Sequence, residues 1–168
     1  MATNEIINLI LSIVTIMLSV IAVIISIFVS NKQNKIALFE KRMEVFSVAD
    51  KLVLLGEQMS CEQMSGKNYS IERFFEVLSF VFSDGQNHTI TEEDANKLNF
   101  YISGVIDSSY FLFKKPIVDN LKIIHQKLVE IKNKRNSPDV MNYVSAFSSA
   151  TIKFSEDNMR KMEKTIKL

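Results

Sequence analysis

The charged residues of this chain are unevenly distributed, because a long stretch near its start contains none. From Ile6 to Val29 the letters read "IINLILSIVTIMLSVIAVIISIFV", without Asp, Glu, Lys or Arg. At ~1.5 Å per residue this stretch forms about 36 Å of helix, enough to cross a hydrocarbon core ~30 Å thick. The pattern predicts a transmembrane helix at residues 6–30, after a short extracytoplasmic N-terminus at residues 1–5.

The residues on either side of this segment indicate an uncleaved anchor and its orientation. A cleaved signal peptide needs a basic start and a shorter apolar run, whereas the only charge before this segment is Glu5. Lys and Arg are enriched on the cytoplasmic side of membrane helices. Basic residues occur only after the segment, first at Lys32, Lys35, Lys41 and Arg42. We therefore expect a single-pass protein of the bacterial inner (cytoplasmic) membrane, with its N-terminus outside and residues 31–168 in the cytoplasm.

Beyond the segment, apolar residues recur at steps of three and four, the spacing of one face of an α-helix. The first stripe contains Ile36, Phe39, Met43 and Phe46 and predicts a helix to about Met59, before the polar connector "CEQMSGKNYS". The sequence does not decide whether this helix continues the anchor without a break. Later stripes predict helices in "SIERFFEVLSFVFS", from Thr91 to Leu112, from Pro116 to about Ile131, and from Ser137 to about Ile166. Residues 31–168 are thus predicted to form one cytosolic helical domain of about five helices, and the fold class is all-α.

The expected helix boundaries rest on residues with known positional preferences. Ser70, Thr91 and Ser137 are suited to the N-cap, where a hydroxyl accepts a hydrogen bond from a free backbone N–H. Pro116 is suited to the first turn, where its missing N–H costs nothing. A turn is expected in "DGQNH" at residues 84–88. With only 4 Gly and 2 Pro in the chain, few other positions interrupt a helix.

Two segments resemble a known set of proteins. "QNKIALFEKRMEVF", just after the anchor, and "SSYFLFKKPIVDNLKII" are similar to segments of a widespread set of uncharacterised bacterial single-pass membrane-anchored helical proteins. In that set an I-A-L-F-[DE]-K-R segment follows the anchor, and an F-L-F-x-x-x-I segment comes later. The resemblance covers about two fifths of the chain. It implies a helical, membrane-tethered protein and no particular reaction.

The residue types that carry catalysis or hold metals do not occur in the required arrangements. His88 and His125 are the only histidines, and no H-x-x-x-H or C-x-x-C spacing is present. Cys61 lies beside Glu62, whose charge disfavours the reactive thiolate. The stretch "DGQNHTITEED" lacks the order of ligands that a calcium loop needs. No glycine-rich phosphate-binding motif occurs. We expect no enzymatic activity, no cofactor and no metal.

The basic residues favour a lipid contact over a nucleic-acid contact. The net charge is only +1, and the basic cluster near the end of the fourth predicted helix has no interleaved aromatic residues. That cluster contains Lys127, Lys132, Lys134 and Arg135. The basic residues nearest the anchor are better suited to anionic headgroups, at ~1 kcal/mol each when close to the surface. We therefore predict lipid contact at Lys32, Lys35, Lys41 and Arg42, and no nucleic-acid partner.

Small and polar residues interrupt the uncharged segment at regular intervals. They are separated by alternating steps of four and three residues, which places them on one face of a helix. They are Asn8, Ser12, Thr15, Ser19, Ala22 and Ser26. Such a face allows two membrane helices to approach closely and predicts a helix–helix seam and a homo-oligomer. The alternative is that each Ser or Thr bonds to the backbone carbonyl four residues earlier.

Two functions are consistent with these features. The first is a membrane-anchored, self-associating interaction protein without catalytic activity, whose cytosolic helices bind a partner protein. The second is a membrane effector, for example in bacterial phage defence, whose transmembrane helices assemble into a pore lined by the polar seam. The number of helices in the assembly separates the two, and the sequence does not specify it.

Overall fold

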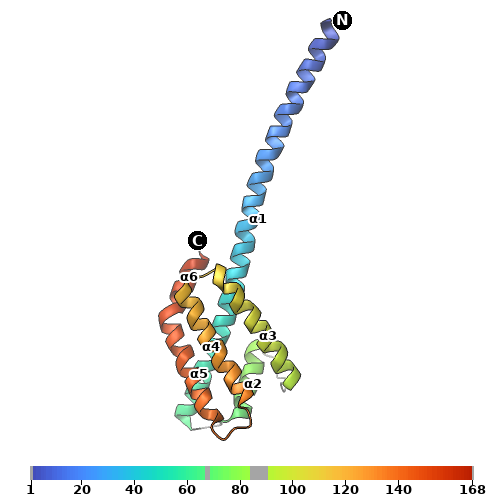
Figure 1. Ribbon diagram of the computed structural model, residues 1–168. Helices are drawn as coiled ribbons and strands as arrows, with labels where there is room; N and C mark the ends of the chain where they lie inside the picture. The colour runs from blue at the N-terminus through green and yellow to red at the C-terminus, as the bar shows by residue number, and fades with distance from the viewer. Residues whose placement is uncertain (1, 67–68, 84–90, 168) are drawn as a thin grey trace. The chain divides into compact units, whose positions relative to one another are not determined.

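The computed structural model describes residues 2–66, 69–83 and 91–167, with the backbone alone for residues 2, 3, 5 and 92. Within these ranges every regular element is helical, which confirms the all-α prediction (Figure 1). The chain divides into two units, Met1–Glu40 and Lys41–Leu168. The second unit contains the five predicted helices and is called the bundle below. Helix α1, Ala2–Ser65, includes the described part of the first unit and the first helix of the bundle.

The bundle part of α1 is held by an apolar face and ends at a glycine. Val45, Leu52 and Met59 are among its fully buried residues. The helix continues beyond the predicted end near Met59, so the first residues of the expected connector are helical. It stops before Gly66, whose φ of +64° is easily adopted only by a residue without a side chain.

The next two helices begin at the predicted N-caps. Helix α2, Ile71–Phe82, starts after Ser70, whose side chain accepts a hydrogen bond from the N–H of Arg73. Helix α3, Glu92–Ser108, starts after Thr91, which forms a reciprocal capping box with Asp94. Both N-cap predictions are confirmed. The turn expected at residues 84–88 lies outside the described residues.

Helix α3 leads through a short 3₁₀ turn into α4. The turn, η1, comprises Ser109–Phe111, and α4 comprises Lys115–Asn133 with Pro116 in its first turn, as predicted. The stripe expected on α4 is entirely buried, at Ile117, Leu121, Ile124, Leu128 and Ile131. Helix α4 packs against α3 on one side and α5 on the other.

The last predicted helix is present, but its start and its middle differ from the prediction. Helix α5, Val140–Phe154, has Asp139 as its N-cap, so the placement of the N-cap at Ser137 was wrong. The Ser137 hydroxyl instead accepts a hydrogen bond from the N–H of Asp139, inside the preceding turn. A π-helical segment, Ser155–Met159, then separates α5 from α6, Arg160–Ile166.

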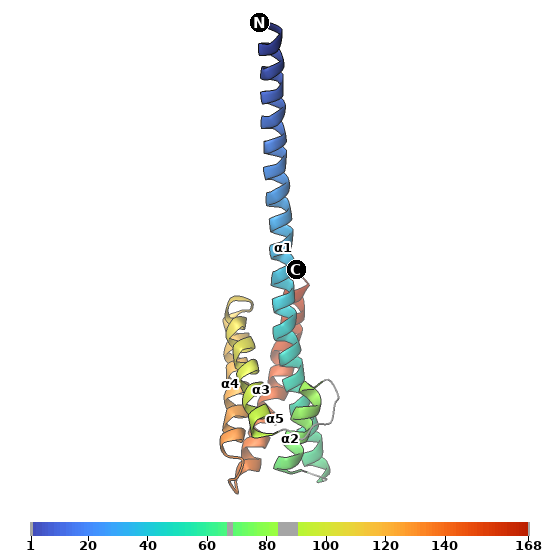
Figure 2. The same cartoon turned by 90° about the vertical axis from the view of Figure 1, so that its right-hand side faces the viewer.

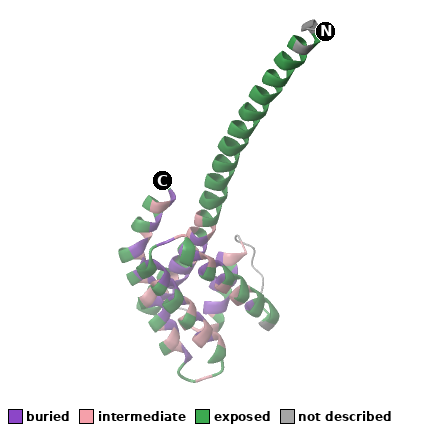
Figure 3. Ribbon diagram, turned by 45° about the horizontal axis from the view of Figure 1, so that its top comes forward, coloured by how far each residue is buried: buried purple, intermediate pink, exposed green. Residues whose placement is uncertain are grey.

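One hydrophobic core joins the helices of the bundle. These helices are drawn in Figure 2, and their buried residues are coloured purple in Figure 3. The ring of Phe74 on α2 meets that of Phe147 on α5 edge-on, with centroids 5.8 Å apart. Gly56 on α1 lies directly against Thr151 on α5. Helix α1 is also tied to α2 by Glu62, whose Oε1 lies 3.0 Å from Arg73 Nε. Side-chain contacts between α1, α2 and α5 thus hold these helices of the bundle together.

Candidate functional site

The uncharged segment of α1 presents a long, exposed apolar surface. Every large apolar side chain from Ile6 to Val29 is exposed, with exposed fractions from 45% at Val29 to 73% at Phe28. The segment is coloured as exposed throughout in Figure 3. Among the described residues, one helix is long and apolar enough to cross a membrane, and it contains this segment.

The predicted seam residues are also exposed, and three of their hydroxyl groups have local partners. Ser12 Oγ donates to the carbonyl of Asn8 at 2.9 Å, and Thr15 Oγ1 donates to that of Leu11 at 2.8 Å. Ser19 Oγ donates to the carbonyl of Thr15 at 2.8 Å. These are the hydrogen bonds expected if each hydroxyl donates to the backbone carbonyl of its own helix, which is the alternative to a helix–helix seam. The seam stays a prediction, and close packing would contribute more to it than hydroxyl donation.

The four basic residues predicted to contact lipid have different environments. Lys32 and Lys35 are exposed in the first unit. Lys41 forms an ion pair with Glu44 at 2.8 Å, and this hydrogen-bonded partner raises the pKa of Lys41. Arg42 is half-buried and donates from Nη1 to the carbonyl of Thr165 at 3.0 Å. Arg42 therefore holds the end of α6 against α1, in addition to any contact with lipid.

The residues with possible acid–base chemistry are dispersed. His125 on α4 is half-buried, and its Nε2 lies 3.0 Å from Asn99 Oδ1 on α3. Burial lowers the pKa of His125, while Asn99 and the charge of Asp107 partly oppose that shift. Cys61 is an exposed free thiol on α1. Among the described residues, no group of His, Cys, Asp and Glu side chains is placed to hold a metal ion. His88 lies outside the described residues.

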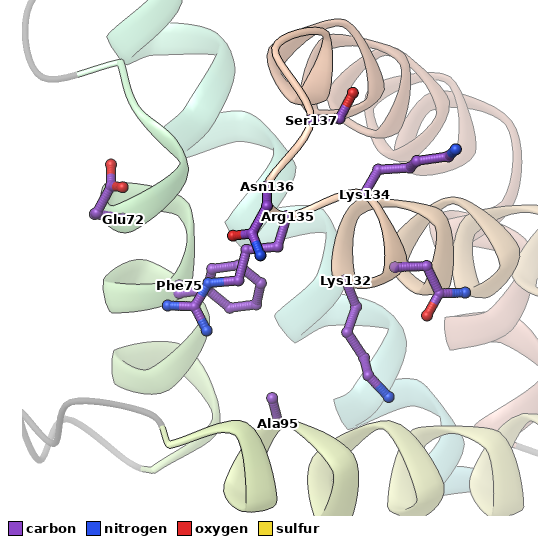
Figure 4. Close-up of a pocket in the computed structure, with 9 residues that line it drawn as sticks. Glu72, Phe75, Ala95, Lys132, Lys134, Arg135, Asn136 and Ser137 are labelled. Carbon is purple, nitrogen blue, oxygen red and sulfur yellow. The ribbon is translucent and has the colours of Figure 1, made fainter.

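A pocket of about 690 Å³ lies between α2, the start of α3 and the loop after α4 (Figure 4). Arg135 lies over the ring of Phe75, with its guanidinium carbon 4.5 Å from the ring centroid. Lys132 donates to Asn96 Oδ1 across the same region. Both cations belong to the basic cluster that has no interleaved aromatic residues in the sequence. Their aromatic and amide partners give them a packing role.

Exposed aromatic residues of α3 and η1 were not predicted from the sequence. Phe100 is 83% exposed and Phe111 is 88% exposed. Both lie off the apolar stripe that contains Ile102 and Val105. Their position off this stripe was the feature of the sequence from which their exposure could have been predicted. An exposed Phe is ordinary when it stands alone, so the surroundings of each ring decide whether it matters.

No protein-family model, curated protein or solved structure matches this chain. The resemblance of the two segments noted above stays a prediction.

Proposed function

We propose that this chain is a single-pass membrane protein that self-associates through residues 6–30 and presents its helical bundle to a partner protein in the bacterial cytoplasm. It acts by binding, without catalysis. The observation that carries the proposal is a contrast between the two units. The bundle buries most of its apolar residues in one core, whereas the uncharged segment exposes all of its large apolar side chains.

The exposed segment requires a covering that the described chain does not supply. Burial of one large apolar side chain contributes about 1.5–3 kcal/mol, so leaving the whole segment in water costs tens of kcal/mol. A lipid bilayer covers every face of one helix at once. The helical backbone satisfies its own hydrogen bonds, as a membrane span requires. A soluble assembly would need many copies to cover the same surface.

The basic residues after the segment support the proposed orientation. Lys32 and Lys35 come soon after Val29, the last apolar residue of the segment, and both are exposed. Retention of such residues in the cytoplasm places the bundle on that side of the membrane. The proposed association rests on the regular spacing of small residues in the segment, which lets helix backbones approach.

Membrane extraction with alkaline carbonate tests the anchoring. The protein should stay in the membrane pellet, whereas Ile16→Lys combined with Val20→Lys should release it. Each lysine at a helix centre costs about 2.5–3.5 kcal/mol on insertion. Ile123→Lys, which adds a charge at an exposed position of the bundle, is the control and should remain in the pellet. Extraction of the unaltered protein would contradict the proposal.

A further inference from the structure

The end of the bundle at η1 carries an unusual pair of exposed aromatic rings. Phe111 is 88% exposed and Tyr110 is 57% exposed. The two rings meet edge-on with centroids 5.6 Å apart. They lie in the short turn between α3 and α4, so no neighbouring helix covers them. The turn thus presents an apolar ring and a phenol together at the end of the bundle.

Three lysines lie close to these rings, two in the sequence and one in space. Lys114 and Lys115 follow directly and are exposed, and neither forms an ion pair with another described residue. Lys122 Nζ lies 5.7 Å from the ring centroid of Tyr110 and 3.9 Å from Asp107 Oδ1. Exposed aromatic rings beside lysines form the combination that favours a membrane interface with anionic lipids.

The η1 end is also the end at which the chain enters the bundle. Figures 1 and 2 both place η1 and α6 at one end of the bundle. The hydrogen bond from Arg42 to Thr165 brings the first residues of the bundle to the same end. From Ser30 to Lys41 a helix would span only ~17 Å. The connection between the proposed membrane span and the bundle is therefore short.

We infer that the η1 end is a second membrane contact, in which Phe111 and Tyr110 enter the headgroup layer and Lys114 and Lys115 bind anionic phospholipids. The inference rests on the proposed membrane anchoring. A protein partner is less favoured, because the rings and lysines lie on a tip instead of a groove. Charge complementarity and the short connection to the segment both select the lipid surface.

The absence of tryptophan from the chain allows a direct test. Phe111→Trp introduces one reporter at the tip, and Phe28→Trp introduces one in the uncharged segment. Phe100→Trp is the matched control, because Phe100 is similarly exposed and lies on α3 away from the tip. Each full-length variant is reconstituted into phosphatidylcholine vesicles with phosphatidylglycerol, and quenching of its fluorescence by brominated lipids is measured.

The three tryptophan reporters test the contact at the η1 end separately from the proposed membrane anchoring. We expect strong quenching at position 28, clear quenching at position 111 and little at position 100. Quenching at 28 without quenching at 111 overturns the inference and leaves the anchoring intact. Equal quenching at 111 and 100 also overturns it, because the contact would then involve the whole face of α3. Absence of quenching at 28 overturns the anchoring itself.

Removal of the lysine charges tests whether the contact needs anionic lipid. In the Phe111→Trp background, Lys114→Gln with Lys115→Gln should reduce quenching in the mixed vesicles to the level seen in phosphatidylcholine alone. Lys127→Gln with Lys134→Gln removes the same charge in the second half of α4 and at its C-cap, and should leave quenching unchanged. Equal quenching by all variants in both vesicle types would overturn the role of anionic lipid.

Discussion

The Thr151 hydroxyl occupies the space that a side chain at Gly56 would need. A Cβ atom added at Gly56 would lie 1.7 Å from Thr151 Oγ1 and 2.8 Å from Thr151 Cβ. The hydroxyl is itself fixed by donation to the carbonyl of Ser148 at 2.8 Å. Helices α1 and α5 therefore approach closely at this point, and the first helix of the bundle depends on a residue without a side chain.

Gly56→Ala should destabilise the bundle by ~1–3 kcal/mol, because overpacking outweighs the gain in helix propensity. Gly104→Ala is the matched control. It lies inside α3 with no atom within 4 Å of the added Cβ, so the same change should stabilise by about 0.5–1 kcal/mol. Chemical denaturation of the full-length protein in detergent measures both. A Gly56→Ala variant as stable as the unaltered protein would show that α5 moves away freely.

The buried stripe of α4 predicts a second pair of opposite outcomes. Leu121 is fully buried and Ile123 is 49% exposed on the same helix. Leu121→Ala should cost ~2–5 kcal/mol through lost burial and the cavity left behind. Ile123→Ala should change the free energy of unfolding by no more than about 0.5 kcal/mol. Equal losses at the two positions would mean that the exposed face of α4 is covered in solution.

Half-burial of His125 makes stability depend on pH in a known direction. Desolvation lowers the pKa of His125 in the folded state below its ordinary value of 6.5. As the pH falls through 6.5, the unfolded chain binds a proton that the folded chain does not, and stability is lost until the folded pKa is reached. His125→Gln should lose less stability than the unaltered protein over that window. Parallel curves of unfolding free energy against pH would refute this assignment.

The elements that the sequence predicted best are those in which one periodicity runs through one helix. The stripe from Ile117 to Ile131 keeps steps of four and three, and all of its members are buried. Ser70 and Thr91 act as N-caps because each hydroxyl immediately precedes a helical turn with free N–H groups. At these positions the local preference of the residue and the packing of the helices favour the same structure. The sequence pattern was therefore sufficient to predict it.

The π-helical segment was missed because it changes the periodicity. Phe154, Asn158, Met162 and Ile166 are all buried and are separated by steps of four. In a regular α-helix successive steps of four rotate around the axis, whereas the wider π turn keeps them on one face. The run of equal steps was a usable signal, although a buried Asn within it hid the pattern. The exposed position of Phe111 could not be predicted from the sequence, because only the packing of the helices shows which aromatic rings remain uncovered.

The small-residue seam predicts a periodic crosslinking profile in membranes. In a Cys61→Ser background, single cysteines at Ser12, Ser19 and Ser26 should crosslink more than those at Ile13, Val20 and Ile27. Replacing Ser19 and Ala22 together with Leu should weaken association, because bulk separates the helix backbones. A flat profile would leave the hydroxyls bonded only to their own backbone, as Ser12, Thr15 and Ser19 are within one chain.

Ion conductance distinguishes a dry seam from a pore. A tightly packed dimer or trimer has no water-filled path, so we expect no loss of membrane potential when the protein is overexpressed. A ring with the seam facing inward would dissipate the potential, and Ser19→Leu would abolish that leak without preventing insertion. A potential-sensitive dye measures the membrane potential in both cases. A leak that Ser19→Leu abolishes would contradict the proposed binding function and would favour a pore.

The exposed thiol of Cys61 offers the most direct test of the membrane-spanning topology. It is the only cysteine of the chain. In intact spheroplasts a membrane-impermeant maleimide should leave Cys61 unlabelled and should label it after permeabilisation. The variant Asn4→Cys with Cys61→Ser should give the opposite result, with labelling before permeabilisation. Labelling of Cys61 in intact spheroplasts would contradict the proposed orientation and the cytoplasmic location of the bundle.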